Sequence, residues 1–176
     1  LDPEPLFFGH ENFISKLPPD QKNRIQLLRK NVLDRGLPPV DIAVAVNFSY
    51  FLFRERELLK KYFQNVYRSL KPKGLYIVDI FGGSQCMDAI VDKTRHKNFT
   101  YYWDQKNFDP VTNYADFAIH FRYKNKLYED VFTYDWRLWS IAEIREIMKE
   151  AGFKQTQVYW EGTARDGGGN GVFTRI

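Results

Sequence analysis

Two apolar runs separated by one amphipathic segment constrain the fold of this chain more than any other feature. Residues 41–48 (DIAVAVNF) and 75–81 (LYIVDIF) are almost continuously apolar, as are strands buried on both faces of a parallel sheet. Between them, residues 54–70 repeat apolar side chains at helical spacing, and Pro72 and Gly74 follow as helix breakers. A strand, a helix and a second strand in this order predict a parallel sheet with helices on its faces.

A further strand is expected upstream of this unit. Residues 25–28 form a short apolar run that leads towards Asn31, and prolines at 38 and 39 mark the loop that follows. Ligands of parallel α/β sheets bind beyond the carboxyl ends of the strands. Those ends are predicted at Asn31, at residues 47–50 and at residues 79–83, so we expect the three segments to meet at one rim.

After about residue 98, alternating side chains replace the strand and helix pattern. A turn at residues 124–126 is predicted to join two antiparallel strands. Phe117, Ile119 and Phe121 alternate on one of them and favour a small β core. The strands predicted in this half of the chain are residues 99–103, 115–123, 127–134, 156–160 and 172–176.

One more helix is predicted over residues 141–151, between these strands. Ser140 is its expected cap and Gly152 its expected end. The Gly-rich residues 166–171 are interpreted as a connection between the last two strands rather than an anion-binding loop, because no helix follows them. We therefore predict an α/β fold made of a single domain over residues 1–176, with a small antiparallel β insertion at about 98–136.

Composition excludes some classes of protein and leaves others open. The net charge of +4 comes from scattered basic residues, whereas a nucleic-acid binder concentrates them on one face. One cysteine, Cys86, allows no internal disulfide and fits a reducing, cytoplasmic location. No apolar run approaches the roughly 20 residues that span a bilayer. Aromatic residues reach 17%; they fill cores first, and they also line pockets for a cation or a flat ligand.

Several segments, in this order, resemble class I S-adenosylmethionine-dependent methyltransferases, whose sheet is Rossmann-like. The most specific parts of the resemblance are the junctions LKPKG and KEAGF, each of which leads from a helix into a strand. Because the chain begins at Leu1 inside an organised pattern, we interpret it as N-terminally truncated, lacking the family's first strands and their Gly-rich cofactor loop. The matching segments are DPEPL at 2–6, LLRKNVLD at 27–34, DIAVAVNFSY at 41–50, LKPKGLYIVDI at 70–80, SIAEIREIMKEAGF at 140–153, VYWEG at 158–162 and NGVFTRI at 170–176.

The resemblance implies S-adenosyl-L-methionine as cofactor and suggests residues that contact it. Asn31 would accept a hydrogen bond from the adenine amino group, and the backbone of Val32 would address the ring nitrogen. The loop after the predicted strand at 41–48 would lie along the cofactor through Asn47, Phe48 and Ser49; a capped loop before a helix is the alternative. The family's ribose-binding acid would precede Leu1, so Asp2 is interpreted as a cap of the first helix.

The same resemblance places the acceptor beneath the β insertion, which would act as a lid over the pocket. Trp103, Gln105 and Arg137 are candidates to meet the acceptor there, together with Tyr50 on the loop after the strand at 41–48. His120 is a candidate general base, the alternative being a histidine that is simply hydrogen-bonded on a strand. Arg137 would bind a carboxylate, or else form an exposed ion pair.

A metal site and a cysteine nucleophile are not expected. The three histidines are dispersed along the chain. Cys86 and His96 lack a recognisable third group that would orient them as a nucleophile and its base. Because a sulfonium already activates the methyl group, the protein mainly has to align a nucleophile and exclude water.

The predicted function is therefore an enzyme that moves a methyl group from S-adenosylmethionine to a small or medium organic acceptor through an oxygen or nitrogen atom. Small-molecule substrates are expected, and neither a nucleic acid nor a membrane. Two alternatives remain at this stage: a non-catalytic ligand-binding or regulatory domain on the same fold, and an RNA or protein methyltransferase.

Overall fold

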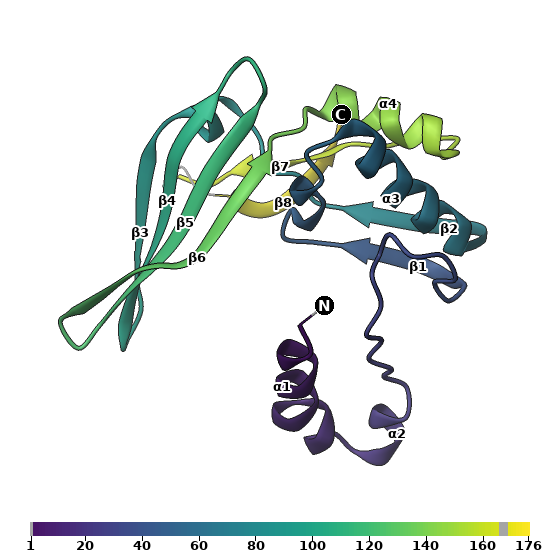
Figure 1. The fold of residues 1–176 in the computed structure, drawn as a ribbon, viewed down its shortest axis with the longest axis horizontal. Coiled ribbons are helices and arrows are strands. Elements are labelled where there is room, and N and C mark those ends of the chain that lie inside the picture. The colour runs from purple at the N-terminus through teal and green to yellow at the C-terminus, as the bar shows by residue number, and fades with distance from the viewer. Residues whose placement is uncertain (1, 166–168) are drawn as a thin grey trace. The chain divides into compact units, whose positions relative to one another are not determined.

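The computed structural model describes residues 2–165 and 169–176. They separate into two compact units, Leu1–Pro38 and Pro39–Ile176. The first unit contains α1 (Glu4–Asn12), the short 3-10 helix η1 (Ile14–Lys16) and α2 (Pro19–Lys22) (Figure 1). The carboxylate of Asp2 accepts a hydrogen bond from the backbone N–H of Glu4 at 2.9 Å, which confirms its predicted role at the start of the helix.

The strand predicted at residues 25–28 is wrong. No strand occurs between α2 and Pro39, and Ile25, Leu27 and Leu28 are all exposed. An apolar run becomes a strand only by pairing with a neighbouring strand and covering a face. Among the described residues, no strand pairs with this segment.

The second unit opens with the predicted parallel pair. Strands β1 (Val40–Ala45) and β2 (Leu70–Val78) run in the same direction with Ala43 opposite Tyr76 and Ala45 opposite Val78. Helix α3 (Arg56–Ser69) connects them, after the short 3-10 helix η2 (Ser49–Leu52). This arrangement confirms the strand, helix and strand read from residues 41–81.

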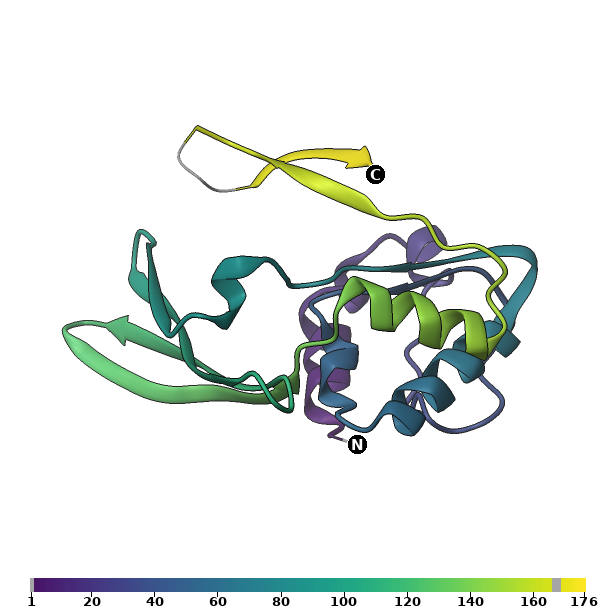
Figure 2. The same cartoon turned by 90° about the horizontal axis from the view of Figure 1, so that it is seen from above.

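Two helices cover one face of this strand pair. Figure 2 shows α3 beside α4 (Ile141–Ala151) on the same side of β1 and β2, and the two helices pack on each other. The core lies beneath them and beside η2; its largest fully buried side chains include Tyr50, Phe51, Leu59, Phe63 and Ile147.

Residues 41–48 and 75–81 were predicted to be buried on both faces of the strand pair. This prediction is wrong for the face that α3 and α4 do not cover. Ile42 and Val44 on β1 and Leu75 and Ile77 on β2 are 45–59% exposed. Side chains alternate between the two faces of a strand, and among the described residues the helices cover only the alternate set.

A four-stranded antiparallel sheet forms the other half of the second unit. Its order is β3 (Ile90–Arg95), β4 (Phe99–Asp109), β5 (Tyr114–Tyr123) and β6 (Lys126–Arg137). The sheet begins earlier than the predicted boundary at 98, because β3 was not foreseen. Lys124 and Asn125 both adopt positive φ, as the predicted tight turn between β5 and β6 requires.

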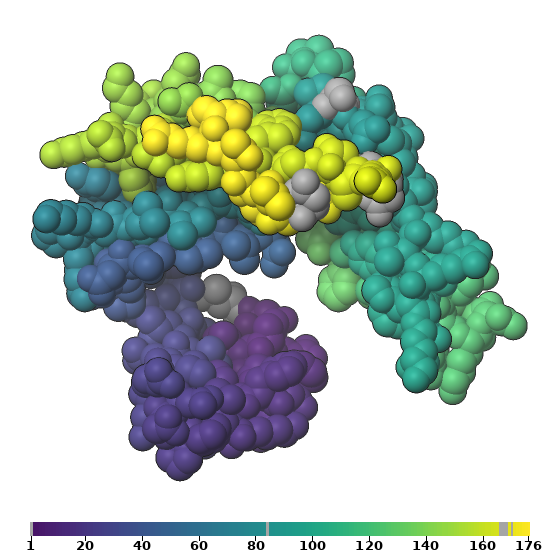
Figure 3. Space-filling view, turned by 180° about the vertical axis from the view of Figure 1, so that it is seen from behind, coloured from purple at the N-terminus to yellow at the C-terminus, as the bar shows by residue number. Residues whose placement is uncertain are grey.

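The C-terminal elements follow the predicted order with shifted strand ends. Ser140 and Glu143 form a reciprocal capping box at the start of α4. Strands β7 (Tyr159–Thr163) and β8 (Gly169–Arg175) pair antiparallel and lie on the outside of the second unit (Figure 3). The predicted connection at 166–171 lies partly outside the described residues. Within the described chain, no helix combines the length and apolar character needed to cross a membrane.

Candidate functional site at the ends of the parallel strands

One carboxylate joins the carboxyl ends of β1 and β2. Asp79, directly after β2, accepts a hydrogen bond from the backbone N–H of Asn47 at 2.8 Å and another from that of Phe48 at 3.0 Å. Its own backbone carbonyl accepts a hydrogen bond from the hydroxyl of Tyr50 at 2.8 Å. These three contacts, which we call the Asp79 clamp, fix the loop after β1 to the end of β2.

The clamp explains an uncommon backbone conformation in this loop. Asn47 and Phe48 are consecutive non-glycine residues with φ of 61° and 52°, a left-handed region that side chains disfavour. The conformation turns two successive N–H groups towards one point, which is how a backbone binds an anion. Here the anion is the carboxylate of Asp79, so the structure holds the loop in place at the cost of local strain.

Beside the clamped loop lies a cavity of about 730 Å³, which we call the strand-end cavity. The loop after β1 and the residue Phe81 after β2 form one side, and one face of the antiparallel sheet forms the other. Ligands of parallel α/β folds bind at this end of the strands. The lining residues are Asn47, Phe48, Ser49, Leu52, Phe81, Tyr101, Trp103, Ile119, Thr133, Tyr134, Asp135 and Trp136.

Aromatic rings from three segments form a continuous surface in this cavity. The centroid of Trp103 lies 6.3 Å from Phe81, 6.0 Å from Tyr134 and 6.1 Å from Trp136. Tyr134 and Trp136 are 4.7 Å apart. We call these four rings the aromatic wall. Phe48 extends it from the clamped loop, with its ring 5.6 Å from Phe81.

Charge in the strand-end cavity is sparse, because the carboxylate of Asp135 alternates with the rings of Tyr134 and Trp136 and lies on the opposite face of β6 from them. Among the described lining residues Asp135 alone carries a charged side chain. Asp135 forms an ion pair with Arg54, whose guanidinium also lies 3.7 Å above the ring of Tyr114. Side-chain oxygens of Asn47, Ser49, Tyr101 and Tyr134 supply neutral polarity. Such a cavity suits apolar and positively charged groups better than anionic ones.

Four of the residues suggested from sequence line the strand-end cavity: Asn47, Phe48, Ser49 and Trp103. Tyr50 does not line it. Its ring is only 1% exposed, and its hydroxyl belongs to the Asp79 clamp. Burial raises the pKa of Tyr50, so this hydroxyl stays protonated and serves as a hydrogen-bond donor. We therefore assign Tyr50 to positioning of the loop, not to acceptor contact.

The side chains of Gln105 and Arg137 make their contacts outside the strand-end cavity. The side-chain amide of Gln105 is buried and donates to the carbonyls of Gln85 and Asp88 at 3.2 and 3.3 Å. Arg137 donates to the carbonyl of Arg54 and to Glu143, both at 3.2 Å, and its guanidinium stacks 3.7 Å above Trp139. These contacts hold β4 and β6 to their neighbours and give neither side chain a place in the cavity.

His120 is held in one tautomer. Its Nδ1 accepts a hydrogen bond from the backbone N–H of Asp130 at 2.8 Å, so the ring proton sits on Nε2, which lies 3.1 Å from a carboxylate oxygen of Asp104. A general base needs a free lone pair within reach of the acceptor. The lone pair of Nδ1 is engaged, and His120 does not line the cavity, so the alternative of a hydrogen-bonded strand histidine is the better interpretation.

Asn31 and Val32 lie in the first unit, Leu1–Pro38. The side-chain oxygen of Asn31 accepts a hydrogen bond from the backbone N–H of Leu33 at 2.9 Å, which shapes a local turn. Asn31 and Val32 are exposed. Their contact with adenine stays a prediction.

The thiol of Cys86 has a structural role and low reactivity. It donates to the carbonyl of Gly83 at 2.9 Å, and burial raises its pKa, which keeps it protonated and poorly nucleophilic. His96 stacks on Phe99 with centroids 4.5 Å apart. Among the described residues, no group of three His, Cys, Asp or Glu side chains is arranged to hold a metal ion.

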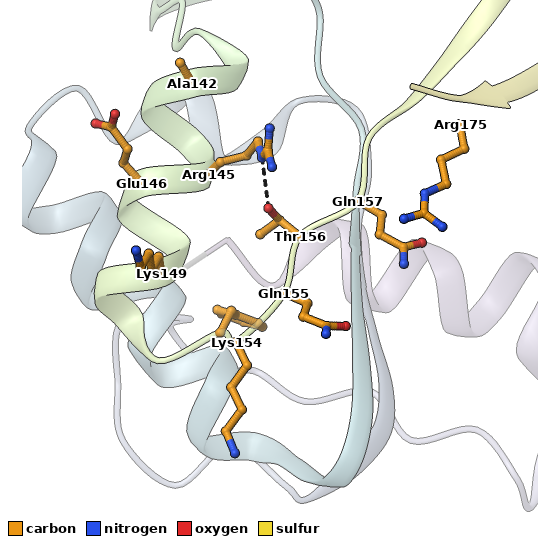
Figure 4. A pocket seen from close by; sticks show the side chains of 10 residues that line it. Ala142, Arg145, Glu146, Lys149, Lys154, Gln155, Thr156, Gln157 and Arg175 are labelled. Carbon is orange, nitrogen blue, oxygen red and sulfur yellow. Dashed lines mark hydrogen bonds between the residues drawn. The ribbon is translucent and has the colours of Figure 1, made fainter.

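A second hollow of about 630 Å³ runs along α4 (Figure 4). Arg145, Lys149, Lys154 and Arg175 line it with one acid, Glu146. We call it the basic groove. Arg145 is fixed there by a 2.9 Å hydrogen bond to the hydroxyl of Thr156. The basic groove shares no residue with the strand-end cavity, whose described lining holds no Lys or Arg, so the two hollows suit different ligands.

Sequence reasoning missed eight of the twelve described residues that line the strand-end cavity. It placed Asp79 at the rim but not as the clamp, and it did not single out the rings that complete the wall. Two signals were present: the aromatic pairs at 101 and 103 and at 134 and 136, each spaced so that both rings share one face of a strand. The lining residues that it missed are Leu52, Phe81, Tyr101, Ile119, Thr133, Tyr134, Asp135 and Trp136.

Comparisons place this architecture in a known class of fold. No protein-family model and no curated protein matches the chain, but solved structures do. A S-adenosylmethionine-dependent methyltransferase from Clostridium acetobutylicum matches with a TM-score of 0.66 and 21% identity, over 86% of this chain and 61% of that one. The CcbJ methyltransferase from Streptomyces caelestis matches with a TM-score of 0.68 and 14% identity, over 90% and 62%.

A third match is CalS10 from Micromonospora echinaspora, an amino pentose methyltransferase of calicheamicin biosynthesis whose structure holds bound S-adenosylmethionine. Its TM-score is 0.59 at 13% identity, over 86% of this chain and 72% of that one. The chain spans about three fifths of the length of the first two proteins. At these identities the likeness is one of fold. It confirms the methyltransferase-like α/β fold predicted from sequence.

Proposed function

We propose that this protein transfers a methyl group from S-adenosyl-L-methionine to a small organic acceptor bound in the strand-end cavity. The Asp79 clamp is the observation that carries the proposal. It holds Asn47, Phe48 and Ser49 at the carboxyl ends of two parallel strands, directly beside a large aromatic cavity. Cofactors of parallel α/β sheets bind at that end, and the cavity gives an acceptor a place next to it.

The chemistry of the cavity fits the reactive end of this cofactor. A sulfonium is a cation, and cations are stabilised by ring faces and by oxygen atoms. Phe48 supplies a ring on the clamped loop, Asn47 and Ser49 supply side-chain oxygens, and no Lys or Arg side chain is among the described lining residues. We propose that Asn47, Phe48 and Ser49 contact the cofactor, with Asn31 and Val32 addressing adenine.

Alignment and exclusion of water are the tasks left to the protein. The cofactor supplies a methyl group that is already activated for attack. The aromatic wall offers a dry surface that orients an acceptor, and placing reactants in line contributes up to about 7–11 kcal/mol of barrier lowering in favourable cases. His120 is not required as a base, since a nucleophile with a free lone pair reacts without one.

The antiparallel sheet is proposed to act as a lid subdomain of a single methyltransferase domain. Its strands supply seven of the twelve cavity residues: Tyr101, Trp103, Ile119, Thr133, Tyr134, Asp135 and Trp136. A nitrogen or oxygen acceptor of small-molecule size suits a hollow of this volume. Methylation of an amino sugar, as the name of CalS10 describes for that protein, is one reaction of this kind. A cytoplasmic location is proposed with it.

Calorimetry with S-adenosylhomocysteine tests the proposal directly. The full-length protein should bind this product with a dissociation constant in the micromolar range, and Ser49→Ala and Asn47→Ala should each weaken binding by about 3- to 10-fold, the effect of one lost hydrogen bond. Thr174→Ala on β8, away from the cavity, is the matched control and should bind as the unchanged protein does. Absence of binding by the full-length protein would contradict methyl transfer.

A further inference from the structure

We propose that one end of the antiparallel sheet is a docking surface for an acidic segment of a partner protein. We call this surface the basic tip and define it as residues 93–100 and 121–128. It comprises the turn between β3 and β4, the turn between β5 and β6, and the strand ends beside them (Figure 1). The basic tip shares no residue with the strand-end cavity, and the proposal does not depend on methyl transfer.

The fold gathers basic residues that are scattered along the sequence. Thr100 on β4 lies between Arg95 on β3 and Arg122 on β5, and Phe99 lies opposite Tyr123. This register puts both turns at the same end of the sheet, where Figure 1 shows them. Six basic residues therefore share the tip: Lys93, Arg95, Lys97, Arg122, Lys124 and Lys126.

No acidic residue of the tip balances this charge. Its two ranges contain no Asp or Glu, and all six basic side chains are exposed. Within the described part of the chain, none of the six forms an ion pair, and the net charge of the whole chain is only +4, so the rest of the chain carries a net negative charge. Several basic residues elsewhere in the second unit do form ion pairs: Arg54, Arg56, Lys60, Lys71, Lys106 and Arg137.

Three of the six cations lie around the side chain of Tyr102. The ammonium of Lys93 lies 5.7 Å from the ring centroid, and Nε of Arg122 donates a hydrogen bond to the hydroxyl at 3.2 Å. Arg95 shares this face of the sheet, because it follows Lys93 by two residues on β3. The hydrogen bond from Arg122, together with the charges of the three cations, lowers the pKa of Tyr102. Carboxylates are attracted to such a concentration of positive charge.

Exposed rings flank the cations of the basic tip. Phe99, Tyr123 and Tyr128 are exposed. The two tyrosine ring centroids lie 5.1 and 4.9 Å from the ammonium groups of Lys124 and Lys126, respectively. Aromatic residues and Arg are enriched in protein interfaces, and opposite charge selects a partner and speeds its association. The tip therefore offers apolar contact together with a charge that an acidic partner complements.

Membranes and nucleic acids fit the basic tip less well. The outermost residues of its turns, 96–98 (HKN) and 124–125 (KN), are polar, so no apolar side chain leads into a bilayer. A single-stranded nucleic acid stacks its bases on rings that lie beside the cations that hold its phosphates. Arg122 and Tyr123 are consecutive on β5 and point to opposite faces, so one strand cannot use both. A partner protein needs only one face and the turns.

Binding of a short acidic peptide to the full-length protein tests the proposal. The probe is a fluorescently labelled ten-residue peptide of alternating glutamate and serine, and glutamine replaces glutamate in its neutral counterpart. We expect fluorescence anisotropy at about 50 mM NaCl to show that the acidic peptide binds at least about tenfold more tightly than the neutral one. At about 300 mM NaCl the affinity should fall at least about threefold, because salt screens exposed charges.

Charge reversal on the basic tip locates the binding site. A triple variant should weaken binding of the acidic peptide at least about tenfold, and its exposed positions favour retention of the fold. A second variant, Lys97→Glu with Lys126→Glu, leaves the surroundings of Tyr102 unchanged and should weaken binding at least about fivefold. The triple variant combines Lys93→Glu, Arg95→Glu and Arg122→Glu.

The matched control reverses three charges in the basic groove and should weaken binding no more than about threefold. If the acidic peptide is not preferred over the neutral one, or if the control loses as much affinity as the tip variants, the proposal is wrong. A ten-residue oligothymidylate or phosphatidylserine vesicles that bind the tip more tightly than the acidic peptide would also overturn the assignment to a protein partner. The control combines Lys149→Glu, Lys154→Glu and Arg175→Glu.

Discussion

At the scale of single residues, the carboxylate of Asp79 determines where the candidate site is. Asn47 and Phe48 adopt left-handed conformations that cost about 1 kcal/mol or more each, and the two hydrogen bonds to Asp79 offset that cost. Asp79→Asn replaces one acceptor oxygen with an amide group that has no lone pair to offer. We expect the free energy of unfolding to fall by about 1–3 kcal/mol in urea denaturation.

The matched control for this change is Asp92→Asn on β3, an exposed carboxylate outside the clamp, which should alter the free energy of unfolding by no more than about 0.5 kcal/mol. Asp79→Asn should also weaken binding of S-adenosylhomocysteine. An Asp79→Asn protein as stable as the control would show that the clamp does not hold the loop.

Gly152 is a second residue whose identity the fold dictates. It ends α4 with φ of 118°, and a Cβ there would lie 2.8 Å from the ring of Tyr67. Gly152→Ala therefore meets backbone strain and a rigid ring at once, and we expect a loss of about 1–3 kcal/mol in thermal or urea unfolding. Gly82→Ala, where a Cβ meets nothing within 4 Å and φ is not positive, should be nearly neutral. Equal effects of the two changes would contradict this account.

At the scale of elements, an ion pair ties α3 to α4. Glu150 accepts hydrogen bonds from Arg56 and is paired with Lys60 at 3.1 Å, and these partners lower the pKa of its carboxyl from 4.5 to about 2. A lowered pKa in the folded state stabilises the protein at pH values above the unfolded pKa. That contribution is lost as pH falls from about 4.5 through about 2.

Glu150→Gln should therefore reduce the melting temperature at neutral pH and have progressively less effect below pH 4.5. Because the pair is exposed, the effect at neutral pH should be small. Melting curves at several pH values in low salt measure it. In an Arg56→Gln background the effect of Glu150→Gln should shrink. A difference that grows on acidification would contradict the assigned role of the pair.

Sequence predicts these elements where local chemistry is sufficient. Ser140 and Gly152 bound α4 as predicted, and the turn at Lys124 and Asn125 joins β5 to β6 as predicted. Local signals fail where a partner is needed. Residues 25–28 have the composition of a strand but no strand partner, and β3 has too few apolar residues to be recognised without its neighbour β4.

The candidate site, like the fold, could be predicted only in part from the sequence. The position of the loop at Asn47 could be predicted from the parallel strands, because the carboxyl ends of parallel strands lie at the same edge of the sheet. Trp103 followed from its place in the insertion. The assignments of Gln105 and Arg137 could not be checked by pattern alone, since their partners, Gln85 and Glu143 among them, are reached only through the tertiary fold.

At the scale of the whole molecule, a bound cofactor should stabilise the folded protein. Asn31 is proposed to address adenine, and Asn47 and Ser49 are proposed to lie along the rest of the cofactor. A ligand that binds only the folded state stabilises it by about 2.7 kcal/mol at 100 times its dissociation constant. For a chain of this size, that corresponds to a rise in melting temperature of roughly 5–10 °C.

We therefore expect S-adenosylhomocysteine to raise the melting temperature of the full-length protein by several degrees in a scanning calorimetry experiment. Asn31→Ala should reduce the affinity for S-adenosylhomocysteine by about 3- to 10-fold, because one hydrogen bond is lost. The melting temperature of the ligand-free protein should change by no more than about a degree or two. Arg24→Ala, also in the first unit, is the control and should leave the affinity unchanged. If Asn31→Ala bound as tightly as this control, the adenine contact assigned from sequence would be wrong.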